Sequence, residues 1–282
     1  MNKSLRYKRT IEQIREQYAV EKELAERLRN ARKGERRNLY SKLYDELYER
    51  IPHHPQLTRK DERESRKRSV AAQVKILSSF LTPEATFLEL GPGDCLVSFE
   101  VAKRVRKVYA IDVSDEITKS FEQSPNFELI LSDGSSIDVP SESVDVAYSN
   151  QLMEHLHPED AVDQVRGVYN ALIPGGIYIC ITPHRFSGPH DISRYFDDVA
   201  TGFHLKEYTH RELYDLLKKV GFKKIEIFCV VRDLFIKLPI YPSLFLELLL
   251  EPLSISVRRF LSKVFFSNLR GEELGIRIIA TK

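Results

Sequence analysis

The chain has 282 residues, of which 42% are hydrophobic and 30% are charged, and its formal net charge is +2 at pH 7. This near balance of charge gives no reason to expect a nucleic-acid partner. No apolar run reaches the length of about 18 residues that a membrane-spanning helix needs, and the polar N-terminus does not resemble a signal peptide. The three cysteines lack metal-ligand spacing and fit a reducing compartment. We therefore expect a cytoplasmic globular protein that binds no nucleic acid.

Residues 1–68 predict an N-terminal helical arm. Charged residues dominate positions 4–50, and sparse leucines recur among them at helical spacing. We expect two helices there, bent or broken near Gly34. The prolines within 51–55 then lead the chain out of helix, because a residue that precedes proline is pushed toward extended geometry.

Residues 69–282 alternate between helix and strand patterns. Helices are predicted over 69–81, 96–106, 158–172 and 209–220. Seven strands are predicted over 86–90, 108–113, 127–132, 144–149, 176–182, 223–231 and 275–280. This alternation predicts an α/β fold with a mostly parallel sheet covered by helices on both faces.

The most distinctive polar residues and glycines follow the ends of these strands. Gly91 and Gly93 come after the first strand, where they permit a tight turn and the close approach of a ligand to the backbone. Asp112 closes the second strand, Asp133 follows the third and Asn150 follows the fourth. Because open parallel sheets bind ligands outside the carboxyl ends of their strands, we expect a ligand site at this edge.

Five features in this order and spacing resemble the class I S-adenosylmethionine-dependent methyltransferases. They are Glu-Leu-Gly-Pro-Gly at 89–93, the acidic strand end at Asp112, Asp-Gly at 133–134, Glu-His-Leu at 154–156 and Pro-Gly-Gly at 174–176. Each is weak evidence alone, but the set is specific and covers roughly residues 80–231 and the final strand. The resemblance implies a Rossmann-like fold and S-adenosyl-L-methionine as cofactor.

The resemblance also implies roles for individual residues. Cofactor-binding roles are implied for Glu89, Gly91, Gly93, Asp112, Val113, Asp133, Gly134 and Asn150. Glu89 would lie near the cationic amino-acid end of the cofactor, and Asn150 would bound the methionine end. Asp112 would bind the ribose hydroxyls, with Val113 against the adenine face and Asp133 at the adenine amino group. Since N-terminal helices often close over the cofactor in this family, the arm is also a candidate lid.

Two alternatives remain beside this interpretation. A nicotinamide-dependent oxidoreductase uses a similar glycine-rich turn, but it needs a third glycine or alanine where this chain has Leu96. Glu89 would also repel a pyrophosphate, whereas it suits an ammonium or sulfonium. The methyltransferases often carry a further glycine after Gly93, where this chain has Asp94 and Cys95, although many of them tolerate the change. The second alternative is a non-catalytic scaffold that keeps the fold for association.

Candidates for catalysis are His155, Glu154 and His190. Methyl transfer is an in-line displacement, so alignment of the reactants supplies much of the acceleration. A hydroxyl acceptor must also lose its proton, and a histidine suits that task. The competing interpretations are structural, with His155 packed beneath a loop and Glu154 acting as a cap or orienting group. No metal-ligand spacing is present, and we expect no metal.

The acceptor is indicated less directly. Residues 187–196 resemble a subgroup associated with polysaccharide or other secondary biosynthesis. We expect a small-molecule or lipid-linked sugar substrate, methylated on oxygen, such as a sugar, a glycolipid or a secondary metabolite.

Residues 233–269 predict an apolar helical insertion before the last strand. Leucine and phenylalanine are frequent there and alternate with arginine and lysine, while Glu247 and Glu251 make the segment too polar to span a bilayer. Three interpretations are open: a cap on the acceptor pocket, a homodimer surface, and peripheral contact with a membrane. The first two are the more common outcomes in proteins.

Overall fold

Among the residues that the computed structural model describes (9–58, 63–113, 124–231, 234–266 and 275–282), eight strands form one sheet. The strands are β1 (Thr86–Leu90), β2 (Lys107–Asp112), β3 (Phe127–Leu131), β4 (Val144–Asn150), β5 (Leu172–Thr182), β6 (Lys224–Val231), β7 (Leu234–Pro239) and β8 (Ile276–Thr281). Their order in the sheet is β3-β2-β1-β4-β5-β8-β6-β7. Strands β1 to β5 are parallel, and the β5–β8, β8–β6 and β6–β7 pairs are antiparallel. The predicted mostly parallel α/β fold is confirmed.

The sheet has one strand more than the seven predicted. The additional strand, β7, pairs with β6 and opens the segment that the sequence predicts as a helical insertion. A short apolar run does not distinguish a buried strand from a helix, which explains the error. Residue 233 and residues 267–269 of the predicted insertion lie outside the described residues.

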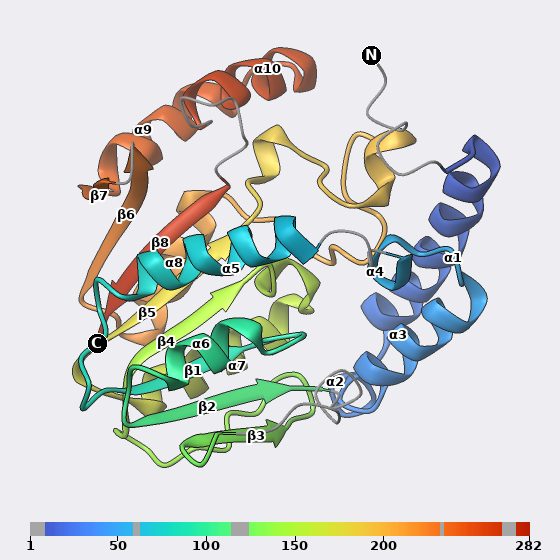
Figure 1. Cartoon of the computed structure of the whole chain (residues 1–282). Coiled ribbons are helices and arrows are strands. Elements are labelled where there is room, and N and C mark those ends of the chain that lie inside the picture. Colours follow the sequence, from blue (N-terminus) through green and yellow to red (C-terminus); the bar gives the residue numbers. More distant parts are fainter. Residues whose placement is uncertain (1–8, 59–62, 114–123, 232–233, 267–274) are drawn as a thin grey trace.

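Helices cover both faces of the sheet (Figure 1). They are α1 (Ile11–Asn30), α2 (Lys33–Arg36), α3 (Leu39–Arg50), α4 (Pro55–Thr58), α5 (Arg63–Leu77), α6 (Leu96–Ala102), α7 (Pro158–Ala171), α8 (His210–Val220), α9 (Tyr241–Leu250) and α10 (Ile255–Phe265). Three short 3-10 helices are η3 (Met153–His155), η4 (Arg185–Ser187) and η5 (Ile192–Tyr195). None of the helices in the described ranges is both long and apolar enough to cross a membrane.

Alternating residues of each strand belong to two separate cores. Phe87 lies in the core under α5 and α6, whereas its neighbour Leu88 lies in the core under α7 and α8. This follows from the strand geometry, since successive side chains point to opposite faces. The second core also contains Leu28 and Leu43 from the N-terminal helices.

The N-terminal helices lie across the carboxyl ends of the parallel strands. In Figure 1 the arrowheads of β2 and β4 point toward α1, α2 and α3, which are drawn in blue. As predicted, the arm is bent near Gly34, which lies in the short α2, and residues 51–54 leave the helix. The predicted domain boundary at residue 68 falls inside α5. The arm therefore shares a core with the sheet and covers the edge at which the ligand site is expected.

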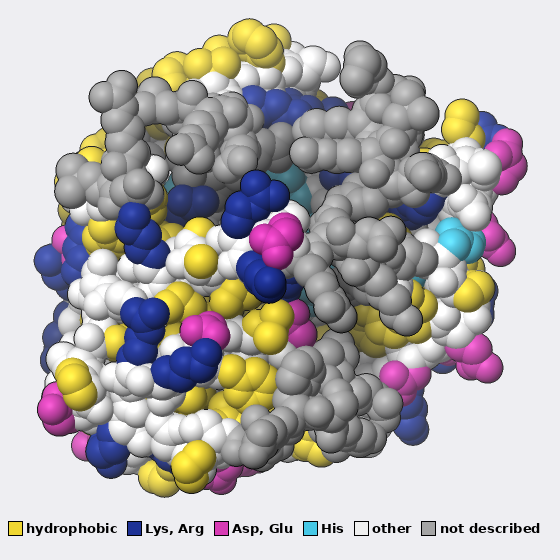
Figure 2. All heavy atoms as spheres, viewed as in Figure 1, with side chains coloured by type: hydrophobic (Ala, Val, Ile, Leu, Met, Phe, Trp, Pro, Cys, Tyr) yellow, Lys and Arg dark blue, Asp and Glu magenta, His cyan; other side chains and the backbone are white. Residues whose placement is uncertain are grey.

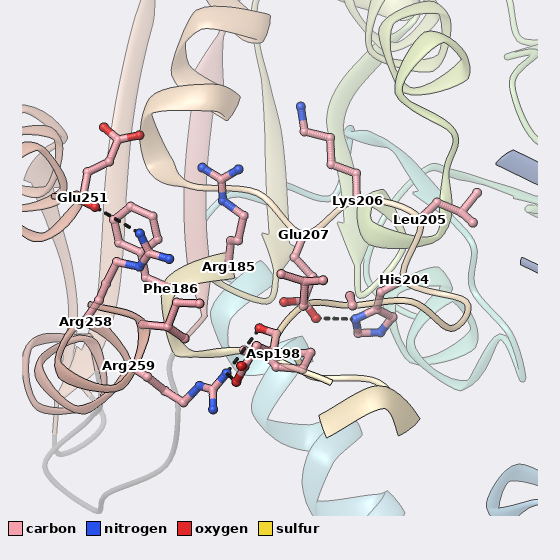
Figure 3. Close-up of a pocket in the computed structure, with 15 residues that line it drawn as sticks. Arg185, Phe186, Asp198, His204, Leu205, Lys206, Glu207, Glu251, Arg258 and Arg259 are labelled. Atoms are coloured by element: carbon pink, nitrogen blue, oxygen red, sulfur yellow. Dashed lines mark hydrogen bonds and ion pairs between the residues drawn. The ribbon is translucent and has the colours of Figure 1, made fainter. Parts of the chain in front are cut away.

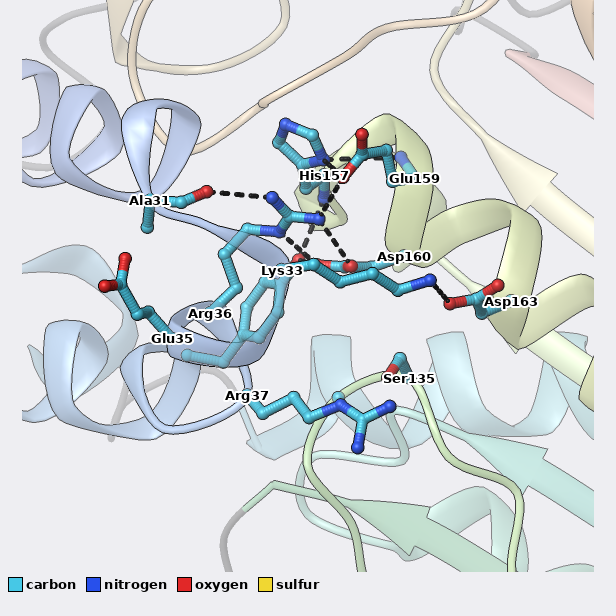
Figure 4. A network of polar contacts seen from close by, with 12 residues as sticks. Ala31, Lys33, Glu35, Arg36, Arg37, Ser135, His157, Glu159, Asp160 and Asp163 are labelled. Carbon is cyan, nitrogen blue, oxygen red and sulfur yellow. Dashed lines mark hydrogen bonds and ion pairs between the residues drawn. The ribbon is translucent and has the colours of Figure 1, made fainter.

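A buried ion pair fastens this arm to α7 (Figure 4). The Arg36 guanidinium donates to both carboxylate oxygens of Asp160, at 2.7 and 2.9 Å, and it also donates to Glu159 and to the Ala31 carbonyl. The Tyr40 hydroxyl donates to the same Asp160 carboxylate at 2.7 Å. Arg36 and Asp160 are only 2% and 3% exposed. A bidentate pair with this many further hydrogen bonds holds two buried charges in one geometry.

We predict that Arg36→Ala lowers the free energy of unfolding by about 3–5 kcal/mol, because it leaves the Asp160 carboxylate buried without its counter-ion. Urea denaturation measures this loss. The control is Arg27→Ala, which removes an exposed ion pair with Glu46 and should lose less than about 1 kcal/mol. Equal losses for the two variants would contradict the anchoring role of Arg36.

Candidate active site

The site begins where the strand order reverses. Strand β1 lies between β2 and β4: the chain runs from β1 to β2 and β3 on one side and then crosses to β4 on the other, which puts the topological switch point at the carboxyl ends of β1 and β4. Three non-glycine residues of the described chain have a positive φ, and two of them, Cys95 and Gln151, follow these two strands. Left-handed backbone costs a non-glycine residue roughly 1–2 kcal/mol and concentrates at functional sites.

The glycine-rich turn after β1 has the open geometry that the sequence predicts. Gly91 and Gly93 have φ of +62° and +59°, which favours glycine at both positions. A Cβ on Gly91 would come within 2.9 Å of Leu152, whereas a Cβ on Gly93 would meet nothing within 4 Å. The backbone at Gly93 is thus exposed to a ligand, and the turn packs through Gly91 on the loop after β4.

Asp112 lies against this turn. One of its carboxylate oxygens accepts the Gly93 amide N–H at 3.1 Å, and the other accepts the Val113 amide N–H at 2.7 Å. The side chain is half-buried at the end of β2. The backbone donors fix the orientation of the carboxylate, a group that accepts hydrogen bonds from hydroxyls.

Glu89 lies beneath the same turn, and it is 5% exposed. The Ser98 hydroxyl of α6 donates to its carboxylate at 2.5 Å. Burial raises the pKa of Glu89 to about 7, against the opposing effect of Ser98. A cationic ligand at this place would supply the positive charge that a buried carboxylate lacks.

The neighbouring strand ends are occupied by intramolecular contacts. Asn150 donates to Gln73 of α5 at 3.0 Å. One oxygen of Asp133 accepts the backbone N–H groups of Ser135 and Ser136, and the other pairs with Arg37 of the arm at 3.2 Å.

Gly134, in the same turn as Asp133, has a φ of +89°. A Cβ there would come within 2.9 Å of the Tyr40 ring. Asp133 thus builds its own turn, and the arm packs directly on that turn.

A second group of polar residues follows β4 and β5. Glu154 is fully buried, and its Oε2 accepts the Thr182 hydroxyl at 2.8 Å, while its Oε1 has no partner. Burial raises the pKa of Glu154 to about 6. A ligand atom of Glu154 lies within 4.8 Å of one from each of His155 and His204, so these three residues could also hold a metal ion. We call Glu154, His155 and His204 the polar cluster.

His155 is held in one orientation. Its Nδ1 lies 3.0 Å from the Phe203 carbonyl, which can only accept, so this nitrogen carries the proton. Nδ1 also lies 3.0 Å from the Tyr44 hydroxyl of α3. Burial lowers the pKa of His155 to about 3, so the ring is neutral and its Nε2 carries the lone pair.

His204 and Glu207 join the third predicted catalytic residue, His190, to the polar cluster. Burial opposes protonation of His204, yet the carboxylates of Glu207 and Glu154 hold its pKa above the ordinary value. Glu207 bonds to His204 Nδ1 at 2.8 Å and accepts the His190 amide N–H at 2.7 Å. His190 Nε2 lies 3.1 Å from the His184 carbonyl. The structure therefore places all three predicted catalytic residues on one edge of the sheet.

A second histidine–carboxylate group, fully buried behind this edge, also has metal-ligand residue types. Glu247 of α9 lies 2.7 Å from His184 Nε2 and 2.8 Å from His210 Nδ1, and it accepts the backbone N–H of His210. His184 Nδ1 accepts the Phe186 N–H. These contacts are hydrogen bonds, and they fasten α9 to the start of α8.

Sequence reasoning missed Tyr44, His204 and Glu207. His204 and Glu207 lie in a segment without regular periodicity, so their spacing gave no indication of what they face. Tyr44 lies on a charged helix whose buried face could not be assigned to a partner.

Residues 88–180 match the family described as Methyltransferase domain. These residues therefore form a methyltransferase domain of the kind that the sequence predicts, and the comparisons support S-adenosylmethionine as its cofactor. The roles of the individual site residues remain predictions, and their arrangement fits S-adenosylmethionine, since the open backbone at Gly93 lies beside a buried acid and a half-buried carboxylate.

Named relatives agree with this assignment. A probable S-adenosylmethionine-dependent methyltransferase of Mycolicibacterium smegmatis is 30% identical over 138 residues, which are 48% of this chain and 51% of the relative. One of Mycobacterium tuberculosis is 31% identical over 147 residues, 50% of this chain and 51% of the relative. The chain thus spans about half the length of the curated relatives it matches.

A solved structure shares the fold of this chain. The structure of an S-adenosylmethionine-dependent methyltransferase from Archaeoglobus fulgidus superposes with a TM-score of 0.51 at 19% identity, covering 78% of this chain and 97% of that chain.

We predict that binding of S-adenosylmethionine releases a proton from Glu89. The pKa of Glu89 is about 7 in the free protein, so the carboxyl is largely protonated below pH 7, and a bound cation lowers that pKa. The affinity should therefore fall about tenfold for each pH unit below 7, until the pKa of the complex is reached. Isothermal titration in buffers of different ionisation enthalpy measures both the affinity and the released proton.

Glu89→Gln should remove this pH dependence, and the exposed-site control Glu84→Gln should retain it. An affinity of the wild-type protein that is constant between pH 5.5 and 8, roughly the range over which such a group titrates, would contradict the assignment.

Proposed function

We propose that this protein transfers the methyl group of S-adenosylmethionine to a hydroxyl of a small-molecule acceptor, such as a sugar, a glycolipid or a secondary metabolite. The observation that carries the proposal is the polar cluster immediately beside the cofactor turn. Leu152, which packs against Gly91, lies two residues before Glu154. A proton acceptor and the proposed cofactor site thus share one loop.

Bound S-adenosylmethionine supplies an electrophilic methyl group. Glu89 would balance its cationic end, and Asp112 would bind its ribose hydroxyls from the end of β2. Val113 and Asn150 would border the adenine and the methionine end, respectively. The Asp112 carboxylate is oriented in advance by two backbone N–H groups, which lowers the cost of ordering on binding.

Within the polar cluster, Glu154 is the residue best suited to remove the hydroxyl proton. Its pKa of about 6 lies close to neutral pH, and its Oε1 has no partner. An effective general base combines a pKa near the operating pH with a free lone pair. His155 has a pKa of about 3 and is a weaker base, so we assign it to accepting a hydrogen bond through Nε2 and orienting the acceptor.

A cavity of about 430 Å³ beside the polar cluster would bind the acceptor (Figure 3). His204 and Glu207 line its inner end, and Arg258 and Arg259 of α10 line the side formed by the insertion. The ring of His204 is 4.9 Å from that of His155. The volume lies in the range of small-molecule pockets, about 300–1,000 Å³.

We predict that the protein transfers label from [methyl-³H]S-adenosylmethionine into the small molecules and lipids of a cell extract. Glu154→Gln should lower the rate by roughly 10²–10⁴, the usual contribution of a general base, and leave cofactor affinity unchanged. Because the carboxylate is the active form, the wild-type rate should rise with pH through about 6 and then level off.

The matched control is Glu64→Gln, an exposed carboxylate on α5 that should leave the rate unchanged. Cofactor binding without transfer of label into any fraction would contradict the enzymatic proposal and favour a non-catalytic scaffold. Label confined to protein or nucleic acid would contradict the small-molecule acceptor.

A further inference from the structure

The insertion helices α9 and α10 present their apolar faces to solvent. Of the sixteen strongly exposed large hydrophobic residues among those described, eleven lie between Leu238 and Phe265. On α9 the exposed residues are Tyr241, Phe245, Leu248 and Leu249, and on α10 they include Val257, Phe260 and Val264. Their spacing of three and four places each set on one side of its helix. We call these seven residues the outer apolar face.

On α10 this arrangement inverts that of an ordinary surface helix, which turns its apolar stripe toward the core, whereas α9 buries Leu244 and Leu250 and exposes a second apolar set. The inward residues of α9 include Glu247, held by the two buried histidines. The inward residues of α10 are Arg258, Arg259 and the fully buried Ser262. Figure 2 shows yellow side chains along the top edge, where Figure 1 places α10, with blue side chains directly below them.

The inner side of α10 forms one wall of the acceptor cavity. Ile255, Arg258 and Arg259 line it, and Arg185 and Lys206 line it from the main fold. In Figure 3, Arg185 lies between Arg258 and Lys206. Four cationic side chains from α10, η4 and the loop before α8 therefore meet around one cavity.

These cations exceed the carboxylates that neutralise them. Asp198 pairs with Arg259 at 3.3 Å, while Arg185 and Lys206 share the single carboxylate of Glu212, at 3.4 Å each. Arg258 donates to the backbone carbonyl of Glu251 and packs 4.7 Å from the Phe186 ring centre. No described carboxylate lies within ion-pair distance of it.

The other two acids that line the cavity form no ion pair with these four cations. Glu207 is already engaged by His204 and by the His190 N–H, and Glu251 is exposed at the rim. The cavity therefore suits an anionic group such as a phosphate or phosphodiester.

We propose that the outer apolar face inserts into the interface of an anionic membrane, and that the cavity behind α10 receives the anionic headgroup of an amphiphilic acceptor from that membrane. The identification of the headgroup as the acceptor rests on the function proposed above. The outer apolar face, together with Lys263 and the cavity arginines of α10, combines burial of apolar area with attraction to anionic lipid.

A second copy of this chain fits the same surface less well. A twofold interface brings a patch against its own copy, and the cations beside the outer apolar face would then meet like charges. An anionic lipid surface has the opposite sign and imposes no such repulsion.

Sedimentation with lipid vesicles tests the proposal. Wild-type protein should bind vesicles of phosphatidylcholine with about 30% phosphatidylglycerol, and bind pure phosphatidylcholine at least about tenfold more weakly. Phe245→Ser with Phe260→Ser should lower binding about tenfold, because both rings are exposed and carry the apolar contact. Arg185→Gln with Arg258→Gln should reduce the preference for phosphatidylglycerol about tenfold.

The matched control is Ile11→Ser with Leu131→Ser, which removes two exposed apolar side chains far from the insertion in sequence and should leave vesicle binding unchanged. Wild-type protein that remains in the supernatant with both vesicle types would overturn the proposal. A solution dimer that Phe245→Ser with Phe260→Ser converts to monomer would also overturn it.

Titration of the same preparations with S-adenosylmethionine, together with the assay of label transfer, separates this inference from the proposed function. A protein that binds the cofactor but no vesicles contradicts the membrane inference alone. One that binds anionic vesicles but transfers no methyl group supports the surface and contradicts the proposed function.

Discussion

The buried ion pair between Arg36 and Asp160 is the contact on which the arrangement of the site depends. It fixes the turn between α1 and α3 against the start of α7, directly at the carboxyl edge of the sheet. From that anchor, α3 packs Tyr40 on Gly134 and brings Tyr44 to His155, while Arg29 of α1 donates to backbone carbonyls at 201–204. One arm therefore holds both the proposed cofactor side and the proposed acceptor side of the edge.

The two sides of this edge are built differently. The cofactor side consists of strand ends, where Glu89, Gly93 and Asp112 are placed by the sheet itself and by backbone hydrogen bonds. The acceptor side consists of loops and the insertion, and its polar groups are connected through Glu207 and Glu247. A shared scaffold with variable loops is how one fold serves many acceptors, so the acceptor must be argued from the cavity and not from the fold.

The strand ends and the turn of the proposed cofactor side could be predicted from the sequence, because strands and tight turns have local signatures. The positive φ at positions 91 and 93 favours glycine there, and Asp112 closes a strand that the helix–strand alternation predicts. The acceptor side could not be predicted in the same way. His204 and Glu207 lie in an irregular segment whose contacts depend on tertiary structure, and the short run that forms β7 carries no signal separating strand from helix. The apolar residues of α9 and α10 were recognised, but only the structure shows which of them face outward.

Equilibrium binding of S-adenosylmethionine, measured by isothermal titration alongside S-adenosylhomocysteine and NADH, tests the central claim most directly. We expect saturable binding of the two adenosyl compounds and none of NADH. Asp112→Ala should weaken binding by about 10- to 100-fold through loss of the charged hydrogen-bond acceptor for the ribose hydroxyls. Binding of NADH alone, or adenosyl binding that Asp112→Ala leaves unchanged, would contradict a cofactor site at the ends of β1 and β2.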